Sequence, residues 1–306
     1  MNGFRSERGQ ALVLSTLFLA AMLGMSALVL DVGSWFREQR DTQRVADAAA
    51  LAGAQALPFD TSEARSLALK YTAKNGGGSP TISFRTTLRG TDTIDVKLRR
   101  DAPGFFSKLF GINSVNVGAK ASARAFAPGS ARWVAPIVVN HMHPMLVGCD
   151  GPCFGPQNET DLELDNLHDP GSGNAAGSFG LISLNDDDLD ANTLAEWVVK
   201  GYEGYMGIDD YRSAPSANFN NGQFQAALEK RKGTEMLFPI YKKILGSGST
   251  AKYEVIGWVG FVVLKVNGGG SNQTLHGYFT RVIWEGLPPT SPLSTDYGVR
   301  TIELID

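Results

Sequence analysis

Two cysteines, Cys149 and Cys153, are the side chains of this sequence with the clearest potential for chemistry. The membrane topology derived below places them in an oxidising compartment, so we predict a local disulfide between them. The alternative is a metal centre, because three histidines are close in sequence and imidazole and thiolate are common zinc ligands. These histidines are His141, His143 and His168. Their spacing matches no zinc signature, so we prefer the disulfide and predict neither a metal nor another cofactor.

No assembled catalytic motif is found. The sequence has no Gly-x-Ser-x-Gly nucleophile elbow, Walker loop or dinucleotide fingerprint. Asp186, Asp188 and Asp190 alternate like the ligands of a calcium loop, but Ala191 and Trp197 stand where that loop requires Gly and Glu. We interpret these aspartates as the start of a helix, where acidic side chains meet the positive end of the dipole. A catalytic triad built from residues distant in sequence stays an open alternative. Our prediction, however, is that the protein is not an enzyme.

Chain length and net charge limit the number of domains and the classes of function. The chain has 306 residues, enough for about two domains. Its net charge of -3 lacks the basic excess of nucleic-acid binders, so we predict no nucleic-acid partner. The 35 glycines exceed the average share and indicate many turns.

One stretch predicts a membrane span. Residues 11–30 contain no charged side chain, and a helix of this length covers about 30 Å, the thickness of the hydrocarbon core. The helical pattern continues to residue 57, where Pro58 ends it, which distinguishes the segment from a cleaved secretory signal. Trp35 and Phe36 suit the aromatic belt beyond the span. We therefore predict a single-pass protein.

The charges that flank the span predict its orientation. Arg5 and Arg8 precede it, whereas acidic side chains outnumber basic ones in the turns that follow. By the positive-inside tendency, residues 1–10 form a cytoplasmic stub and the C-terminal part lies outside the cytoplasm.

Small residues give the long helix two candidate packing surfaces. Ala46, Ala50 and Gly53 share one face beyond the membrane, and Ala20 and Gly24 form a small pair within it. Such faces let another backbone approach closely, so we propose helix–helix packing with a partner. In the alternative interpretation, the alanine face rests on the protein's own sheet.

The remaining pattern predicts an α+β fold. Asp60 is the N-cap of a second helix that stops at Asn75, and three strands then complete a small module ending at residue 127. Residues 128–130 are the linker. The second module, residues 131–306, is mostly β with two helices. Its helices are expected at residues 189–200 and 222–232, and its main strands at 133–140, 235–241, 253–266, 275–284 and 299–305.

The N-terminal motifs resemble a known family. Arg8-Gly9-Gln10 leads into the apolar run, Asp31-Val32-Gly33 ends it, and the sequence QRVADAAALAGA follows from Gln43. Together they resemble the N-terminal segment of TadE/TadG-like proteins of bacterial Flp (tight adherence) pilus assembly. The resemblance implies a pilin-like module over residues 31–127. It also implies other pilin-like or Tad-machinery membrane proteins as partners, and a place in the bacterial inner membrane or with the pilus.

The resemblance also raises the question of processing. Pilin-like members are cleaved after a glycine and carry Glu at the fifth mature position. If Gly9 is the cleavage site, Gln10 becomes the first residue and Leu14 the fifth. This departure favours an uncleaved, anchored protein of the TadG type. The Asp-x-Ser-x-Ser motif of adhesive TadG domains is incomplete at Asp60, so metal-dependent adhesion does not transfer.

Two function hypotheses follow. The first is a non-enzymatic, membrane-anchored pilus-assembly protein, in which Asp31, Gln43, Asp47 and the small faces serve packing. Asp31 is expected to mark the outer end of the span, or else to be a solvated interfacial charge. The second hypothesis is a tethered ectodomain that binds or hydrolyses a ligand and uses the helix only as an anchor. Convergence of the histidines and cysteines in one pocket would favour the second.

Overall fold

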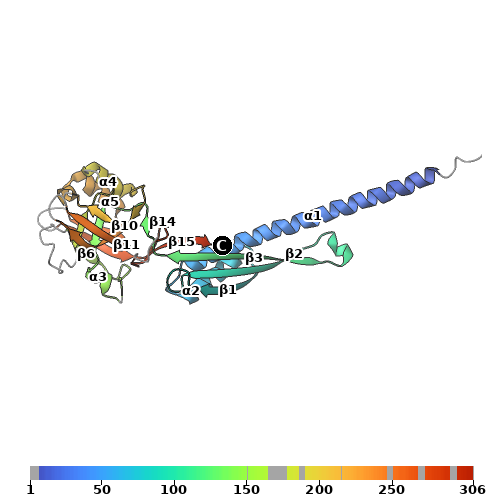
Figure 1. Cartoon of the computed structure of the whole chain (residues 1–306), viewed down its shortest axis with the longest axis horizontal. Coiled ribbons are helices and arrows are strands. Elements are labelled where there is room, and N and C mark those ends of the chain that lie inside the picture. The colour runs from blue at the N-terminus through green and yellow to red at the C-terminus, as the bar shows by residue number, and fades with distance from the viewer. Residues whose placement is uncertain are drawn as a thin grey trace, which may run out of the picture. The chain divides into compact units, whose positions relative to one another are not determined.

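The computed structural model describes residues 7–149, 151–164, 178–185, 190–214, 216–246, 251–267, 273–289 and 295–305. The chain forms two compact units, Met1–Ala125 with Ile302–Asp306, and Phe126–Thr301 (Figure 1). The chain therefore returns to the first unit at its C-terminal end, after it has formed the second unit.

The first unit combines two helices with an antiparallel sheet (Figure 1). Strands β1, β2, β3 and the end of β15 follow one another in the sheet. The elements are α1 (Glu7–Ala54), α2 (Thr61–Lys74), β1 (Ser79–Arg85), β2 (Thr93–Pro103), the 3-10 turn η1 (Ser107–Phe110), β3 (Ser114–Phe126) and β15 (Val299–Ile305). Alternate residues of β2, including Ile94, Val96 and Leu98, face a core shared with both helices. At the end of β15, Glu303 forms an ion pair with Arg124 of β3.

Local signals explain the helix boundaries of this unit. Helix α1 is continuous from Glu7 to Ala54 and ends shortly before Pro58, as the sequence pattern predicts. Helix α2 begins after Asp60, whose carboxylate accepts hydrogen bonds from the backbone N–H groups of Ser62 and Glu63, both at 2.8 Å. The predicted N-cap is confirmed.

The second unit is built around a closed sheet. Its strand order is β10-β5-β7-β6-β12-β11-β9, and because β10 also pairs with β11, six of these strands form a ring. The ring strands are β5 (Ile137–Asn140), β6 (Thr160–Leu164), β7 (Ser178–Leu181), β10 (Glu235–Leu245), β11 (Lys252–Asn267) and β12 (Thr274–Thr280). Buried side chains from all six strands belong to one hydrophobic core. Closing the ring removes the free edges that an open sheet would expose.

Helices and short strands complete this unit. Helices α4 (Ala191–Lys200) and α5 (Gly222–Arg231) pack on each other and contribute Leu194, Val198, Phe224 and Leu228 to the ring's core. The smaller elements are α3 (Pro144–Val147), η2 (Ser216–Asn220), β4 (Ser130–Ala131), β8 (Met206–Gly207), β9 (Asp210–Arg212), β13 (Val282–Ile283) and β14 (Gly286–Leu287).

The predicted fold class, a long apolar helix followed by a mixed α+β arrangement, is confirmed. The predicted hairpin of residues 253–266 and 275–284 is present as the antiparallel pair β11–β12. The expected strand 133–140 is shorter, starting at Ile137, and the expected strand 275–284 is divided into β12 and β13.

Candidate membrane anchor and packing surfaces

The N-terminal half of α1 exposes its apolar side chains. Leu12, Phe18 and Val29 are 71%, 67% and 69% exposed, and no residue of the apolar window is buried. Two of its hydroxyl groups bond within the helix: Thr16 donates to the Leu12 carbonyl at 2.8 Å and Ser26 to the Met22 carbonyl at 2.9 Å. In the described part of the chain, α1 is the one helix long and apolar enough to cross a membrane.

Asp31 connects this apolar segment to the folded unit. Its carboxylate accepts hydrogen bonds from the backbone N–H groups of Phe105 at 2.9 Å, Phe106 at 3.2 Å and Ser107 at 2.5 Å. The side chain thereby satisfies free donors at the start of η1. The expectation of a solvated interfacial charge is corrected, because Asp31 is 1% exposed. A second tie lies one turn further on, where the Trp35 indole N–H donates to the Pro103 carbonyl at 3.3 Å.

Gln43 and Asp47 form the next connection along α1. The Gln43 amide donates at 2.7 Å both to the Asp47 carboxylate and to the Lys120 carbonyl of β3. These two residues of the family-like motif therefore hold the helix on its own sheet.

The alanine face of α1 is buried inside the first unit. Ala46 and Ala50 are completely inaccessible and lie in the core with α2 and the sheet. Gly53 permits the closest approach, because a Cβ at this position would lie 2.5 Å from Ile94 Cδ1 and 2.9 Å from the Ala64 carbonyl oxygen. Of the two interpretations of this face, the structure shows the second, in which it packs on the protein's own domain. The partner role assigned to Ala46, Ala50 and Gly53 is corrected accordingly.

The small pair in the apolar segment is different. Ala20 and Gly24 are exposed, and a Cβ added at Gly24 would meet nothing within 4 Å. This pair is therefore open to a neighbouring helix. Gly9 and Gln10 lie in the first turns of α1, so a cleavage there would leave the apolar segment intact.

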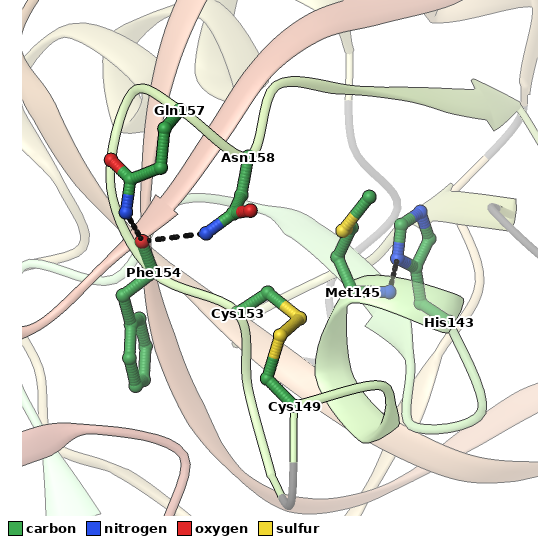
Figure 2. The surroundings of a disulfide bond; sticks show 7 residues. All are labelled: His143, Met145, Cys149, Cys153, Phe154, Gln157 and Asn158. Atoms are coloured by element: carbon green, nitrogen blue, oxygen red, sulfur yellow. Dashed lines mark hydrogen bonds between the residues drawn. A yellow bond between two sulfur atoms is a disulfide. The ribbon is translucent and has the colours of Figure 1, made fainter.

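The cysteines and histidines of the second unit do not form a shared ligand set in the described residues. Cys149 and Cys153 are joined by a disulfide (Figure 2). The Cys153 N–H donates to the Met145 carbonyl at 2.7 Å. His143 is buried and caps α3, its Nδ1 accepting from the Met145 N–H at 3.1 Å (Figure 2). Burial lowers the pKa of His143, and also that of His141.

A metal site is therefore not supported at this place. Disulfide sulfurs are not thiolates, and thiolates are what zinc binds. Within the described residues, no group of three or more His, Cys, Asp or Glu side chains is arranged to hold a metal ion. His168, Asp186 and Asp188 lie outside the described residues, whereas Asp190 caps α4 by accepting from the Thr193 N–H at 2.8 Å.

The structure reveals a polar cluster on the second unit that sequence reasoning missed. Glu285 accepts hydrogen bonds from Arg132 Nη1 at 3.0 Å, the Trp133 indole at 3.1 Å and the Tyr205 hydroxyl at 3.2 Å. The bonds from Trp133 and Arg132 hold the pKa of Glu285 below its usual range. The Arg132 guanidinium also lies over both aromatic rings. These residues come from three distant segments, and no local pattern connects them.

A cavity of about 230 Å³ adjoins this cluster. Trp133, Trp197 and Trp284 contribute aromatic walls, and Lys200 and Arg231 contribute positive charge. Burial lowers the pKa of Arg231. Aromatic walls and cations together suit an acidic or aromatic side chain of a binding partner.

A known protein family matches the segment that contains most of helix α1. Residues 9–56 match the Tad family model. This model describes TadE/G-like proteins of Flp pilus assembly, and it confirms the resemblance predicted from the N-terminal motifs. The Tad segment contains both the exposed apolar half of α1 and its buried alanine face. It supports a role in Flp pilus assembly. No curated protein and no solved structure matches the chain.

Proposed function

We propose that the protein is a membrane-anchored, non-enzymatic component of Flp pilus assembly. The observation that carries this proposal is the Tad segment itself, in which an exposed apolar helix continues directly into a folded domain. The apolar half of α1 crosses the membrane, and the first unit from Asp31 onward lies outside the cytoplasm together with the second unit. The flanking charges support this orientation, with Arg5 and Arg8 on the cytoplasmic side.

The partners in this proposal are other pilin-like or Tad-machinery membrane proteins. Packing in the bilayer involves Ala20 and Gly24, because they are exposed and small enough for close helix approach. Outside the membrane, the cluster of Arg132, Trp133 and Tyr205 supplies the residue types that dominate protein interfaces.

The decisive experiment separates filaments from membranes. Cells are sheared, and the protein is located in each fraction and its N-terminus sequenced. We expect it in membranes with the residues before Gly9 intact. A chain that begins at Gln10 in purified filaments would make it a processed minor pilin, and the anchored role would be abandoned. Deleting the gene is expected to reduce piliation, and normal pili in the deletion strain would refute a role in assembly.

A further inference from the structure

The turn between β2 and β3 exposes a concentrated set of large apolar side chains. This hairpin tip, residues 104–113, contains five of them. Their exposed fractions are 63% for Phe105, 42% for Phe106, 83% for Leu109, 84% for Phe110 and 47% for Ile112. Exposed apolar patches of this kind mark surfaces that meet a protein or a membrane.

The opposite end of the same sheet has a different composition. The β1–β2 turn, residues 86–92, reads TTLRGTD and has Leu88 as its single large apolar side chain. Asp92 organises that turn by accepting from the N–H groups of Thr87, Leu88 and Arg89. The two turns lie at opposite ends of the 11-residue strand β2, about 35 Å apart. The β1–β2 turn is therefore polar enough to face solvent, whereas the hairpin tip is strongly apolar.

The hairpin tip is bonded to α1 at the end of the apolar segment, and this position indicates which surface it contacts. Asp31 immediately follows the apolar segment 11–30, and its carboxylate bonds the N–H groups of Phe105, Phe106 and Ser107. Figure 1 shows β2 and β3 running alongside α1 towards this turn. The hairpin tip is thus held at the depth where the hydrocarbon core ends. The interfacial layer beyond it is about 5–8 Å thick on each side, comparable with the roughly 8 Å length of a four-residue 3-10 turn.

We propose that the hairpin tip is a second membrane contact, inserted into the leaflet on the Asp31 side of the span. The occupant of this apolar surface is the lipid of the bilayer that α1 crosses. Exposed basic side chains accompany both contacts: Lys108 lies within the tip, and Arg37 lies on α1 about 9 Å beyond Asp31. Such side chains extend towards phosphate head groups while aromatic rings occupy the interface. Two contacts joined through Asp31 restrict the tilt of the first unit on the membrane.

Depth measurements on the full-length chain test this proposal, which relies on the proposed span. Single cysteines replace Phe110, Leu88 or Ala20, and each carries an environment-sensitive fluorophore. The native cysteines are bonded to each other and stay unlabelled. The proteins are reconstituted in vesicles of phosphatidylethanolamine and phosphatidylglycerol, with and without brominated acyl chains.

We expect the label of Phe110→Cys to be quenched by brominated lipid and to be several-fold less accessible to aqueous iodide than that of Leu88→Cys. Quenching at Ala20→Cys with full iodide access at Phe110→Cys would overturn the proposal and leave the span intact. Loss of lipid quenching at both would remove the span as well. Iodide protection without lipid quenching, rising with protein density, would assign the surface to a protein neighbour and also overturn the proposal.

A charge variant provides a second test that leaves the fold intact, because Leu109 and Phe110 are both more than four-fifths exposed. Leu109→Asp with Phe110→Asp is expected to abolish lipid quenching of a label at Ile112→Cys. The control substitution Leu88→Asp should leave that quenching unchanged. Equal quenching in both proteins would contradict the insertion of the hairpin tip.

Discussion

Leucine substitutions at two small positions of α1 distinguish packing within the protein from packing in the membrane. Ala50 is inaccessible in the core of the first unit, whereas Gly24 has open space around it. The face that carries Ala50 has no room to spare, since even one carbon added at Gly53 would approach Ile94 and Ala64 within 3 Å. Ala50→Leu adds three carbons there. We therefore expect the upper part of the usual overpacking range, about 2–3 kcal/mol, in lost unfolding free energy.

Hydrogen exchange of the full-length chain in detergent measures this loss within the first unit. At 1.36 kcal/mol for each factor of ten, protection of the slowest amides of α2 and β2 should fall by roughly 30- to 150-fold in Ala50→Leu. Gly24→Leu should leave these amides unchanged, because no atom of the folded unit surrounds the position. In cells, Gly24→Leu should nevertheless reduce piliation, since a large side chain separates helices that pack through small residues.

Full protection of α2 and β2 in Ala50→Leu, together with a loss of piliation, would refute the assignment of Ala50 to the core. That result would mean that the alanine face meets a partner and is not part of the core. Normal piliation in Gly24→Leu would instead remove the packing role of the small pair in the membrane.

Three further predictions concern single contacts. Asp31→Ala should accelerate amide exchange at Phe105, Phe106 and Ser107, because these N–H groups lose their acceptor, and should leave exchange in β1 unchanged. Exchange rates at these three amides equal to those of the unsubstituted protein would contradict the hydrogen bonds between Asp31 and the start of η1. Replacing Cys149 and Cys153 by serine should lower the stability of the second unit by about 2 kcal/mol, measured by denaturant unfolding, because the disulfide closes a short loop. For His276, burial disfavours the imidazolium, but the hydrogen bonds that its ring nitrogens donate to the Glu159 and Asp161 carboxylates outweigh burial and raise the pKa. The contribution of protonated His276 to stability is complete below the unfolded pKa of about 6.5 and is lost as the pH rises through the higher folded pKa. His276→Gln should therefore flatten the dependence of unfolding free energy on pH between these two pKa values.

Local sequence signals were sufficient for much of the first unit. The break at Pro58, the cap at Asp60 and the alternation of β2 are each determined within a few residues, and each corresponds to an observed boundary or buried face. The short strands β6 and β7 were missed. They lie in a tract rich in glycine and aspartate, and their place in the ring depends on pairing with β12 and β5, which are distant in sequence.

The candidate site was harder to predict because its contacts are non-local. The sequence marks Asp31 as the boundary of a span, yet the backbone N–H groups that donate to its carboxylate lie more than seventy residues away, at the start of η1. The alanine run fitted both a partner helix and the protein's own sheet, since each demands the same small, regularly spaced residues. The burial of Ala46 and Ala50 and the approach of Ile94 and Ala68 to Gly53 distinguish the two.

The division of α1 at Asp31 has a consequence for how such a protein can assemble. Beyond Asp31, the alanine face is committed to the core, and Gln43 is committed to Asp47 and β3. Contacts between this helix and a partner cannot use that buried face, whereas Ala20 and Gly24 of the apolar segment are exposed. In the proposed packing, a partner that binds there approaches within the bilayer, and the hydrogen bonds of Asp31 hold η1 on the same helix. If α1 pairs in the membrane as we propose, that pairing and the position of η1 are coupled through the buried carboxylate of Asp31.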